Sequence, residues 1–302
     1  MDEIATAPQA KPLWRRIVDF PLVALLIALL LLGTAQFVFG QFVAPLFDPV
    51  AEPWRMALLA VTVIALVFAL YKLVIRHLGE IRRDDLRLPG AGKELLLGFG
   101  GAGLLMSAIV GVAALLGVYR IAGWGGSTSW AMILFQGTLV AGFVEEVIFR
   151  GILFRWIEEF AGSWFALALT SILFGWAHLA NDNATPFSSL AIAVEAGIML
   201  GAAYMLTRSL WLPIGIHMGW NFVQGYVWDV PVSGHAVDGL VESRHPGPVL
   251  LSGGDFGLEA SVIALVMATG FGLYLLFLAI KRGNVMRWWW ARRPAKRAVD
   301  PA

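Results

Sequence analysis

Residues 129–154 read SWAMILFQGTLVAGFVEEVIFRGILF, and this stretch decides the fold. It is apolar over more than the roughly 20 residues that a helix needs to cross a bilayer. Its centre nevertheless carries Glu145, Glu146 and Arg150. Charged side chains within a membrane are rare and costly, and they usually mark a functional site. The stretch therefore predicts a transmembrane helix that holds polar groups inside the bilayer.

The composition of the whole chain agrees with this interpretation. Of its 302 residues, 59% are hydrophobic and 14% are charged, and the mean hydropathy is +0.75. Soluble domains are about 45–50% apolar and about 25% charged. We therefore expect an all-α fold, a polytopic bundle of transmembrane helices. The absence of cysteine excludes disulfides, thiolate zinc ligands and a cysteine nucleophile. A net charge of +1 gives no support for nucleic-acid binding.

Apolar runs of spanning length predict about eight transmembrane helices. Because cytoplasmic loops are enriched in Lys and Arg, these residues orient the bundle. With the N-terminus inside, 17 of them fall on the inner side and 3 on the outer side, which predicts that both termini are cytoplasmic. The first run lacks a cleavage site and is expected to remain as a span. The predicted spans are 18–42, 56–75, 94–118, 129–154, 164–180, 187–206, 209–228 and 258–280.

The predicted spans divide the chain into four parts. The outer loop contains His235 and His245, whose irregular spacing is typical of a plain loop rather than a metal site. The tail carries Trp288, Trp289 and Trp290 among basic residues, as anchors in the headgroup region do. The four parts are 1–93, an N-terminal segment with two spans; 94–228, a core whose polar motifs lie within 125–225; 229–257, an extracytoplasmic loop; and 258–302, the last span and the basic tail.

The first polar motif, Glu145-Glu146-x-x-x-Arg150, divides its charges between two tasks. Residues four apart share a helix face, so Glu146 and Arg150 can form an ion pair. Pairing would offset the cost of burying either charge alone. Glu145 lies about 100° further round the helix, where it can face a cavity. We therefore interpret Glu145 as a candidate general base and Glu146 as a structural carboxylate.

Two further motifs place histidines at the same helical spacing. Phe174 and His178 are four residues apart, as are His217 and Asn221, so each pair projects from one helix face. The imidazole of His217 and the carboxamide of Asn221 offer two donors to a developing oxyanion. Small residues beside these motifs would allow close helix approach, namely Gly197 with Gly201 and Gly215 with Gly219.

The depths of Glu145 and His178 can be compared if the chain turns near Gly162. Glu145 precedes that glycine by 17 residues and His178 follows it by 16. At about 1.5 Å per residue, both side chains lie roughly 25 Å from the turn. Antiparallel neighbours would therefore bring them to one level. A lone histidine or a lone Glu–Arg pair in a membrane is more often structural, so it is the combination that favours catalysis.

Together the three motifs resemble those of the CPBP family, which includes CAAX prenyl endopeptidases, Abi proteins and bacteriocin-processing or immunity proteins. The resemblance covers about residues 125–225. It implies an intramembrane endopeptidase on a helical bundle. It also implies roles for the motif residues: Glu145 and His178 activate water, His217 and Asn221 stabilise the oxyanion, and Glu146, Arg150 and Phe174 support the site.

The family is historically classed with metalloproteases, so a cofactor needs to be considered. Glu145, His178 and His217 offer the two-His, one-Glu set of a catalytic zinc. The chain lacks the His-Glu-x-x-His helix of the zincins, however. We therefore expect no cofactor, with zinc as the alternative. Glu195, in the sixth span, is a further functional candidate because it is a membrane carboxylate, and we expect it beside the site rather than in direct catalysis.

The predicted substrate is a membrane-anchored or lipidated protein or peptide, cleaved near or within the cytoplasmic half of the bilayer. A proton-coupled transporter would also suit buried Glu, His and Arg, although no inverted repeat is evident. A catalytically inactive immunity or scaffold protein is the third interpretation. The Ala-, Leu- and Gly-rich chain shows no organelle signal, which favours a bacterial inner membrane. The lipid bilayer is an expected partner and nucleic acid is not.

Overall fold

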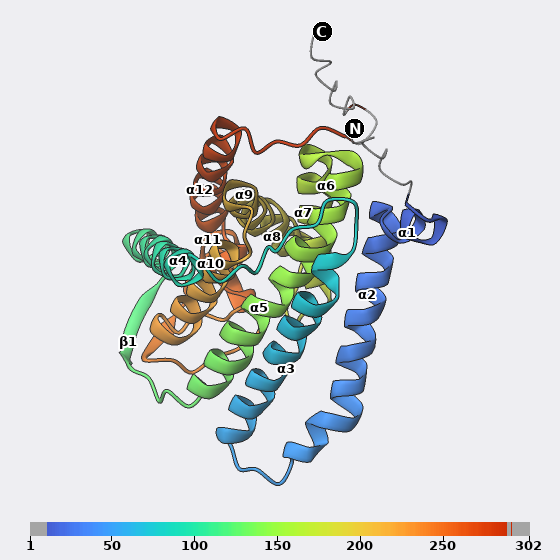
Figure 1. Cartoon of the computed structure of the whole chain (residues 1–302). Coiled ribbons are helices and arrows are strands. Elements are labelled where there is room, and N and C mark those ends of the chain that lie inside the picture. Colours follow the sequence, from blue (N-terminus) through green and yellow to red (C-terminus); the bar gives the residue numbers. More distant parts are fainter. Residues whose placement is uncertain (1–10, 289–290, 292–302) are drawn as a thin grey trace, which may run out of the picture.

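The computed structural model describes residues 11–288 and 291, which form a bundle of long helices with one short two-stranded sheet (Figure 1). The predicted all-α membrane fold is confirmed. The predicted anchor residues Trp289 and Trp290 lie outside the described residues, as do the basic positions beyond 291. Within the described residues, seven helices are long and apolar enough to cross a membrane, namely Pro21–Phe47, Trp54–His77, Ala91–Leu115, Met132–Ala161, Ser163–Ala180, Pro186–Thr207 and Val262–Lys281.

The run predicted at 209–228 is also a helix, but a shorter one than those seven. α10 (Trp211–Phe222) continues directly into η8 (Val223–Val227). At about 1.5 Å per residue it is roughly 26 Å long, slightly less than the hydrocarbon core of about 30 Å. It returns the chain to the far end of the bundle. As a result α1 (Leu13–Val18) and the C-terminal end of α12 (Val262–Lys281) lie at the same end (Figure 1).

Several long helices contain tighter or wider turns, and wide π turns are frequent at functional sites. The first helix consists of α2 (Pro21–Val38), η1 (Phe39–Val43) and η2 (Ala44–Phe47), the second of α3 (Trp54–Leu73) and η3 (Ile75–His77), and the third of α4 (Ala91–Leu115). The fourth comprises η4 (Met132–Val140), α5 (Ala141–Glu146), η5 (Val147–Phe154) and α6 (Arg155–Ala161). The fifth comprises α7 (Ser163–Ala177) and η6 (His178–Ala180), and the sixth α8 (Pro186–Ile192), η7 (Ala193–Gly197) and α9 (Ile198–Thr207).

A small two-stranded sheet and short turns, which the sequence did not predict, close one end of the bundle. β1 (Arg120–Trp124) pairs antiparallel with β2 (Val241–Arg244), although the two strands are far apart in the sequence. Because the strands lie side by side as in a hairpin, we call this the hairpin end. The chain between β2 and α12 forms α11 (Val249–Ser252), η9 (Gly254–Phe256) and η10 (Leu258–Ala260).

Glycines bring α4 and α10 into close contact. A Cβ on Gly98 would lie 2.5 Å from the carbonyl oxygen of Leu212, and Cβ atoms on Gly215 and Gly219 would collide with backbone atoms of α4. Small residues permit such close approach of membrane helices. The sequence predicted tight packing at Gly215 and Gly219, and the structure identifies α4 as the partner. This seam fixes α10, which carries one of the polar motifs.

The other end of the bundle, which we call the basic end, holds a network of buried charges. Tyr71 and Tyr204 each donate to Oδ2 of Asp85, at 3.0 and 3.1 Å. Arg155 Nη1 lies 3.7 Å from the same oxygen, and Arg83 Nε lies 3.2 Å from Oδ1. Since breaking a buried ion pair is strongly destabilising, this network holds the connection between α3 and α4 against α6 and α9.

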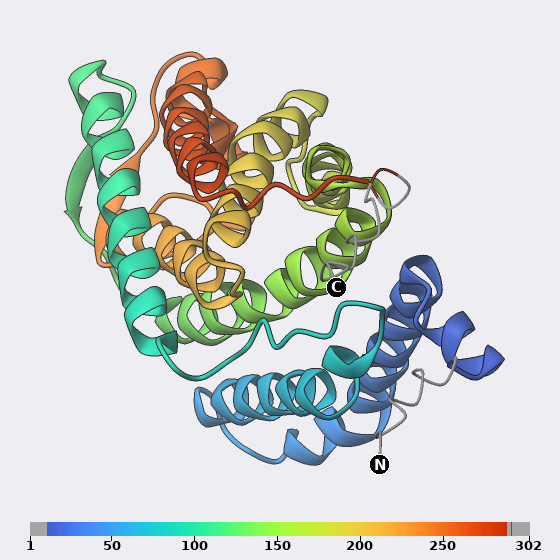
Figure 2. The ribbon, with the colours of Figure 1, turned by 45° about the horizontal axis from the view of Figure 1, so that its top comes forward.

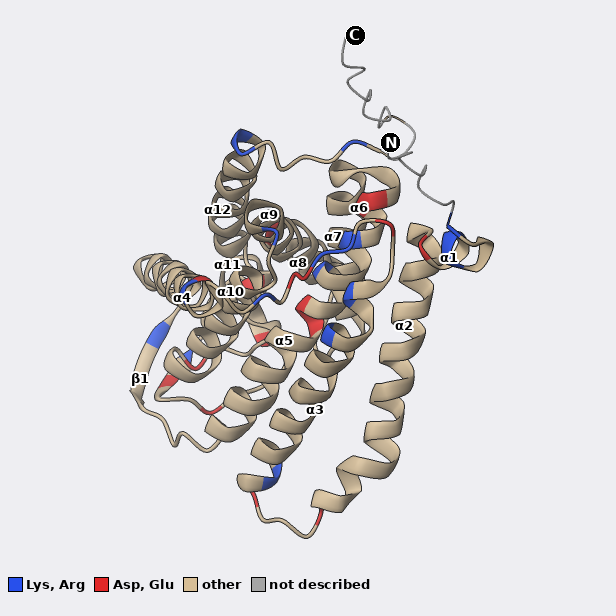
Figure 3. Cartoon of the chain, viewed as in Figure 1, with Lys and Arg blue, Asp and Glu red and all other residues tan. Residues whose placement is uncertain are grey.

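Lys and Arg are distributed unevenly between the two ends (Figure 3). In the described part of the chain, Arg120 and Arg244 lie on the strands of the hairpin end, and Arg55 lies at the start of α3. Arg150 lies inside the bundle, and the remaining Lys and Arg gather toward the basic end. The uneven distribution of Lys and Arg that the sequence predicted between the two sides is therefore also found between the two ends of the bundle.

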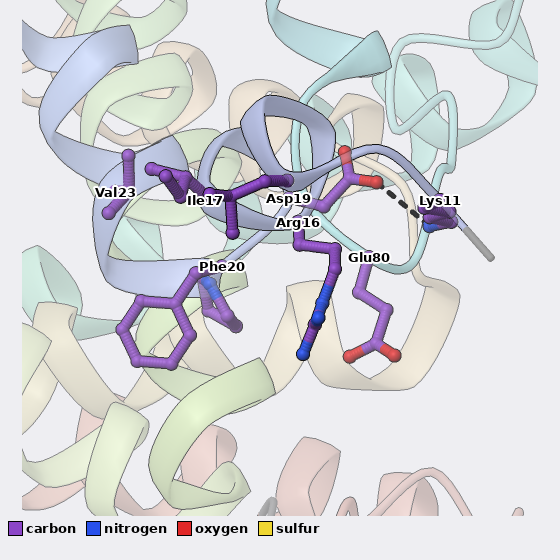
Figure 4. A pocket seen from close by; sticks show the side chains of 9 residues that line it. Lys11, Arg16, Ile17, Asp19, Phe20, Val23 and Glu80 are labelled. Carbon is purple, nitrogen blue, oxygen red and sulfur yellow. Dashed lines mark hydrogen bonds and ion pairs between the residues drawn. The ribbon is translucent and has the colours of Figure 1, made fainter.

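α1 lies at the basic end beside the start of α2, at a cavity of about 830 Å³ (Figure 4). Lys11 Nζ donates to Asp19 Oδ2 at 2.8 Å, while Arg16 and Glu80 also line the cavity. Trp14 is exposed beside these charges. A short turn with a tryptophan and basic residues at the start of a span is typical of the headgroup region.

Candidate active site

The fourth helix supplies a buried ion pair at the first motif. Arg150 Nη1 donates to Glu146 Oε1 at 2.8 Å, and the two side chains are 1% and 0% exposed. This is the pair that the spacing predicted. Glu145 is 34% exposed and makes no contact with Arg150 within ion-pair distance. The neighbouring carboxylates therefore differ in environment as expected, one enclosed and the other open to a cavity.

His217 connects the third motif to the first. Its Nδ1 lies 3.0 Å from Glu146 Oε1, and its Nε2 lies 4.0 Å from Glu145 Oε2. An Nδ1–H that donates to Glu146 directs Nε2 toward Glu145. The sequence did not predict this link, because the two residues are far apart in the chain and no local spacing relates them. Glu146 thus orients a motif histidine in addition to pairing with Arg150.

His178 is fixed by its own helix and by an aromatic neighbour. Its Nδ1 lies 2.7 Å from the carbonyl oxygen of Phe174, so Nδ1 must donate and Nε2 carries the lone pair. The ring of Phe174 lies 4.7 Å from the His178 ring and 6.1 Å from the His217 ring, and the Arg150 guanidinium lies 4.8 Å from its centre. Phe174 therefore packs among the three motifs.

Asn221 is buried on the same helix face as His217. Its Nδ2 donates to the carbonyl oxygen of Gly137 at 2.7 Å. One amide hydrogen is therefore used within the protein, and the second remains for a ligand. The contact also fixes the carboxamide against η4.

The four predicted catalytic residues line one pocket of about 360 Å³, which we call the active-site pocket. Glu145 and His178 both reach it, in agreement with the common depth predicted for them. The pocket also includes His235, which the sequence analysis assigned to a plain loop; its place depends on the path of that loop, which no local pattern reveals. The other lining residues include Gln136, Asn181, Val232 and Ser233, which come from the hairpin end.

The three side chains that zinc would use as the alternative, Glu145, His178 and His217, do not converge on one point. His217 Nδ1 is engaged by Glu146, and its Nε2 lies 4.0 Å from the nearest Glu145 oxygen. Throughout residues 11–288 and at 291, no three His, Cys, Asp or Glu side chains are grouped closely enough to hold a metal ion. The donor set in this arrangement does not fit a zinc ion, so no step below depends on one.

Glu195 lies beside the site, in the π turn η7 of the sixth helix. It is 1% exposed and lines a smaller cavity together with His178, His217 and Asn221. The position expected from the sequence, next to the motifs but not among them, agrees with this placement.

Comparison with known proteins identifies the segment that carries these residues. The model of the family described as type II CAAX prenyl endopeptidase Rce1-like matches residues 126–223. The match extends from just before η4 into η8 and includes all three motifs, so the resemblance noted in the sequence is confirmed. No curated protein and no solved structure matches the chain.

Proposed function

Taking residues 126–223 as a CAAX-protease-type domain of an integral membrane protein, we propose that this protein hydrolyses a peptide bond within the bilayer. The observation that supports it most is the shared pocket, where the open carboxylate of Glu145 meets two histidines and Asn221. Carboxylate, imidazole and amide groups at one cavity can activate water and stabilise a tetrahedral intermediate.

In the proposed mechanism Glu145 is the general base. A water held between Glu145 and Nε2 of His178 gives a proton to Glu145 while its oxygen attacks the carbonyl carbon. The C–N bond then breaks, and the proton held by Glu145 passes to the leaving nitrogen. The fixed Nδ1–H of His178 keeps its Nε2 available to accept a hydrogen bond from the water.

His217 and Asn221 are proposed to bind the oxyanion. The free amide hydrogen of Asn221 and an Nε2–H on His217 can both point into the active-site pocket. His217 lies near two carboxylates, which favour its protonated form in the transition state. Glu146 and Arg150 then serve to orient His217.

The proposed substrate is a membrane-associated or lipidated protein or peptide whose cleavage site reaches the outer half of the bilayer. The pocket is lined by residues of the hairpin end, and Glu145 lies about 25 Å from the turn at the basic end. If the basic end is cytoplasmic, as positively charged ends usually are, the pocket opens to the extracytoplasmic side. This revises our expectation of cleavage in the cytoplasmic half, because the depth estimate is measured from the basic end. A bacterial inner membrane with cytoplasmic termini remains our proposal.

Substrate trapping tests the proposal. Glu145→Gln keeps the shape of the side chain but removes the base, so the variant should retain bound substrate that co-purifies and is identified by mass spectrometry. Glu242→Gln, at an exposed position on β2, is the matched control and should release cleaved product as the wild type does. Cleavage by Glu145→Gln at the wild-type rate would refute the mechanism.

We further propose that catalysis needs no metal. Activity of the purified protein should survive stringent chelation, measured as turnover of a substrate identified by trapping. Loss of activity that only zinc restores would overturn this.

A further inference from the structure

Behind the active-site pocket lies a second cavity of about 30 Å³, which we call the inner cavity. His178, His217, Asn221 and Ser233 line both cavities. A water molecule needs roughly 10–15 Å³ of such space and two or more polar partners. The inner cavity therefore has room for water, and its wall is shared with the candidate catalytic groups.

Two carboxyl groups close the inner cavity, and neither has a counter-ion. Glu195 is 1% exposed, and its Oε2 has no hydrogen-bond partner in the described chain. Glu259, in η10, is 4% exposed, and no Lys, Arg or His of the described residues lies within ion-pair distance of either group. An isolated buried carboxylate is very unfavourable, and two that share a site cannot both ionise readily.

The two carboxyl groups differ in their hydrogen-bond partners. Glu259 accepts from the indole Nε1–H of Trp220 at 3.3 Å and from the backbone N–H of Ser233. Burial raises the pKa of Glu259 to about 7, although these donors oppose the shift. Glu195 has no such donors at Oε2. The negative charge of the pair therefore belongs on Glu259 and the proton on Glu195.

We propose that Glu195 and Glu259 share one proton, and that this singly charged pair is a positioning site that holds the segment 231–235 against the active-site pocket. The Glu259 carboxylate holds the Ser233 N–H, and the Ser233 carbonyl accepts from Asn181 Nδ2 at 3.0 Å. Gly234 N–H donates to the carbonyl of Phe256 at 2.8 Å. The segment is thus held by the Glu259 carboxylate together with contacts from Asn181 and Phe256.

The charged groups around Glu195 come from four elements. His178 faces it from the fifth helix and His217 from α10, while Glu259 faces it from η10. The guanidinium of Arg150 is held by Glu146, and its Nη2 donates to the carbonyls of Ala196 and Gly197 at 3.4 Å. The open carboxylate of Glu145 lies across the shared wall. The nearby cations, Arg150 and protonated His217, already face the carboxylates of Glu146 and Glu145, so neither is free to compensate a second negative charge in the inner cavity.

The sign of the pH dependence follows from these contacts. A coupled pair loses its protons in two steps that belong to the pair rather than to either residue. In the first step Glu259 loses its proton, with a pKa that burial raises from its ordinary 4.5 to about 7, and the pair then carries the single charge that accepts the Ser233 N–H. Loss of the last proton, at higher pH, places two negative charges in the inner cavity. The segment 231–235 should then be released at alkaline pH.

Spin labelling measures this release directly, and the absence of cysteine makes single labels simple to place. A nitroxide on Ala236→Cys should be immobile at neutral pH and mobile at alkaline pH. Adding Glu195→Gln, which copies the protonated form, should keep it immobile at both. A label on Ile121→Cys in β1 controls for general unfolding and should not change. Equal alkaline mobility with and without Glu195→Gln would overturn the proposal, as would an unchanged label in the parent.

Infrared spectroscopy locates the proton without any turnover. At a pH above the titration of Glu259 near 7, the carbonyl stretch of a protonated carboxylic acid should appear in the wild type and in Glu259→Gln, and should disappear in Glu195→Gln. Glu94→Gln, on α4 and near Arg87, is the matched control and should keep the band. Persistence of the band in Glu195→Gln would contradict the assignment.

Activity provides a third measurement, which rests on the proposed function. Above the second apparent pKa, kcat/KM should fall by about tenfold for each pH unit. Glu195→Gln should remove this part of the profile, measured as the ratio of kcat/KM at neutral and alkaline pH. An unchanged ratio would count against the pair. If no proteolysis is found at all, the label and infrared results still decide whether the proton is shared.

Discussion

Glu146 is the residue on which the motifs converge, since its Oε1 meets both Arg150 and His217. Arg150→Met should therefore leave a buried carboxylate without its cation. Removing one partner of a buried pair costs about 3–5 kcal/mol, and we expect a loss of that size in the free energy of unfolding. Arg244→Met is the control, because its exposed pair with Glu242 is worth roughly 0–1 kcal/mol. Equal losses in the two variants would contradict the role of Glu146.

Asn221 should matter more for the rate than for binding. Its remaining amide hydrogen is proposed to meet charge that develops only in the transition state. Removal of one oxyanion donor typically lowers kcat by about 10²–10³-fold, and we expect such a decrease for Asn221→Ala with little change in KM. A steady-state assay on a trapped substrate checks this. A rise in KM at constant kcat would instead place Asn221 in ground-state binding.

The sequence correctly predicted side-chain contacts between residues that lie close together in the chain. The spacing predicted the Glu146–Arg150 pair because four residues separate them on one helix. It could not predict that His217 would share Glu146, or that His235 would line the active-site pocket, because both depend on how distant segments meet. The roles of Glu145, His178, His217 and Asn221 in catalysis remain proposals.

The close packing of α4 against α10 predicts which glycines of α4 can be replaced by alanine. Gly98→Ala should destabilise the bundle, because its Cβ would lie 2.5 Å from the Leu212 carbonyl oxygen. Gly101, on the same helix, has no atom within 4 Å of the position that an added methyl group would take, so Gly101→Ala is the matched control. Alanine usually favours a helix interior over glycine by about 0.5–1 kcal/mol, so the control should be neutral or slightly stabilised. Thermal unfolding in detergent compares the two, and equal melting temperatures would argue against the seam.

The length of each apolar run predicted where the long helices lie. It did not predict the residues at which the helices end or the π turns within them. Hydropathy located every long helix, because each must bury its backbone in lipid. The run 209–228 proved shorter than the other spans, since α10 begins at Trp211 and η8 ends at Val227. The π turns and the β1–β2 sheet depend on how distant segments pack, which the periodicity of the sequence does not reveal.

The orientation of the whole molecule in the membrane can be measured by introducing single cysteines, because the natural chain contains none. If the basic end is cytoplasmic, Ala236→Cys at the hairpin end should react with a membrane-impermeant thiol reagent in intact cells. Glu80→Cys, exposed at the basic end, should react only after permeabilisation. The opposite pattern would show that the active-site pocket opens to the cytoplasm and would restore the expectation drawn from the sequence alone.

Parity explains why the overall arrangement could be predicted although individual boundaries could not. An even number of crossings, as in the eight predicted spans, places both ends of the described chain at one end of the bundle (Figure 1), which comes forward in the turned view (Figure 2). Most of the described Lys and Arg gather at that end (Figure 3), and positively charged ends are usually cytoplasmic. Both signals are summed over the whole chain, so errors of a few residues at each helix end do not affect them.

α4 and α10 run parallel and pack against each other, although they are synthesised at different times. Leu95 meets Gly215, so most of the chain between these helices must be translated before the contact can form. At about 5–20 residues per second, α4 waits in the membrane for roughly 6–24 s without its partner. During that interval its glycine face is available to other helices. Slow translation of the region between α4 and α10 would prolong this exposure.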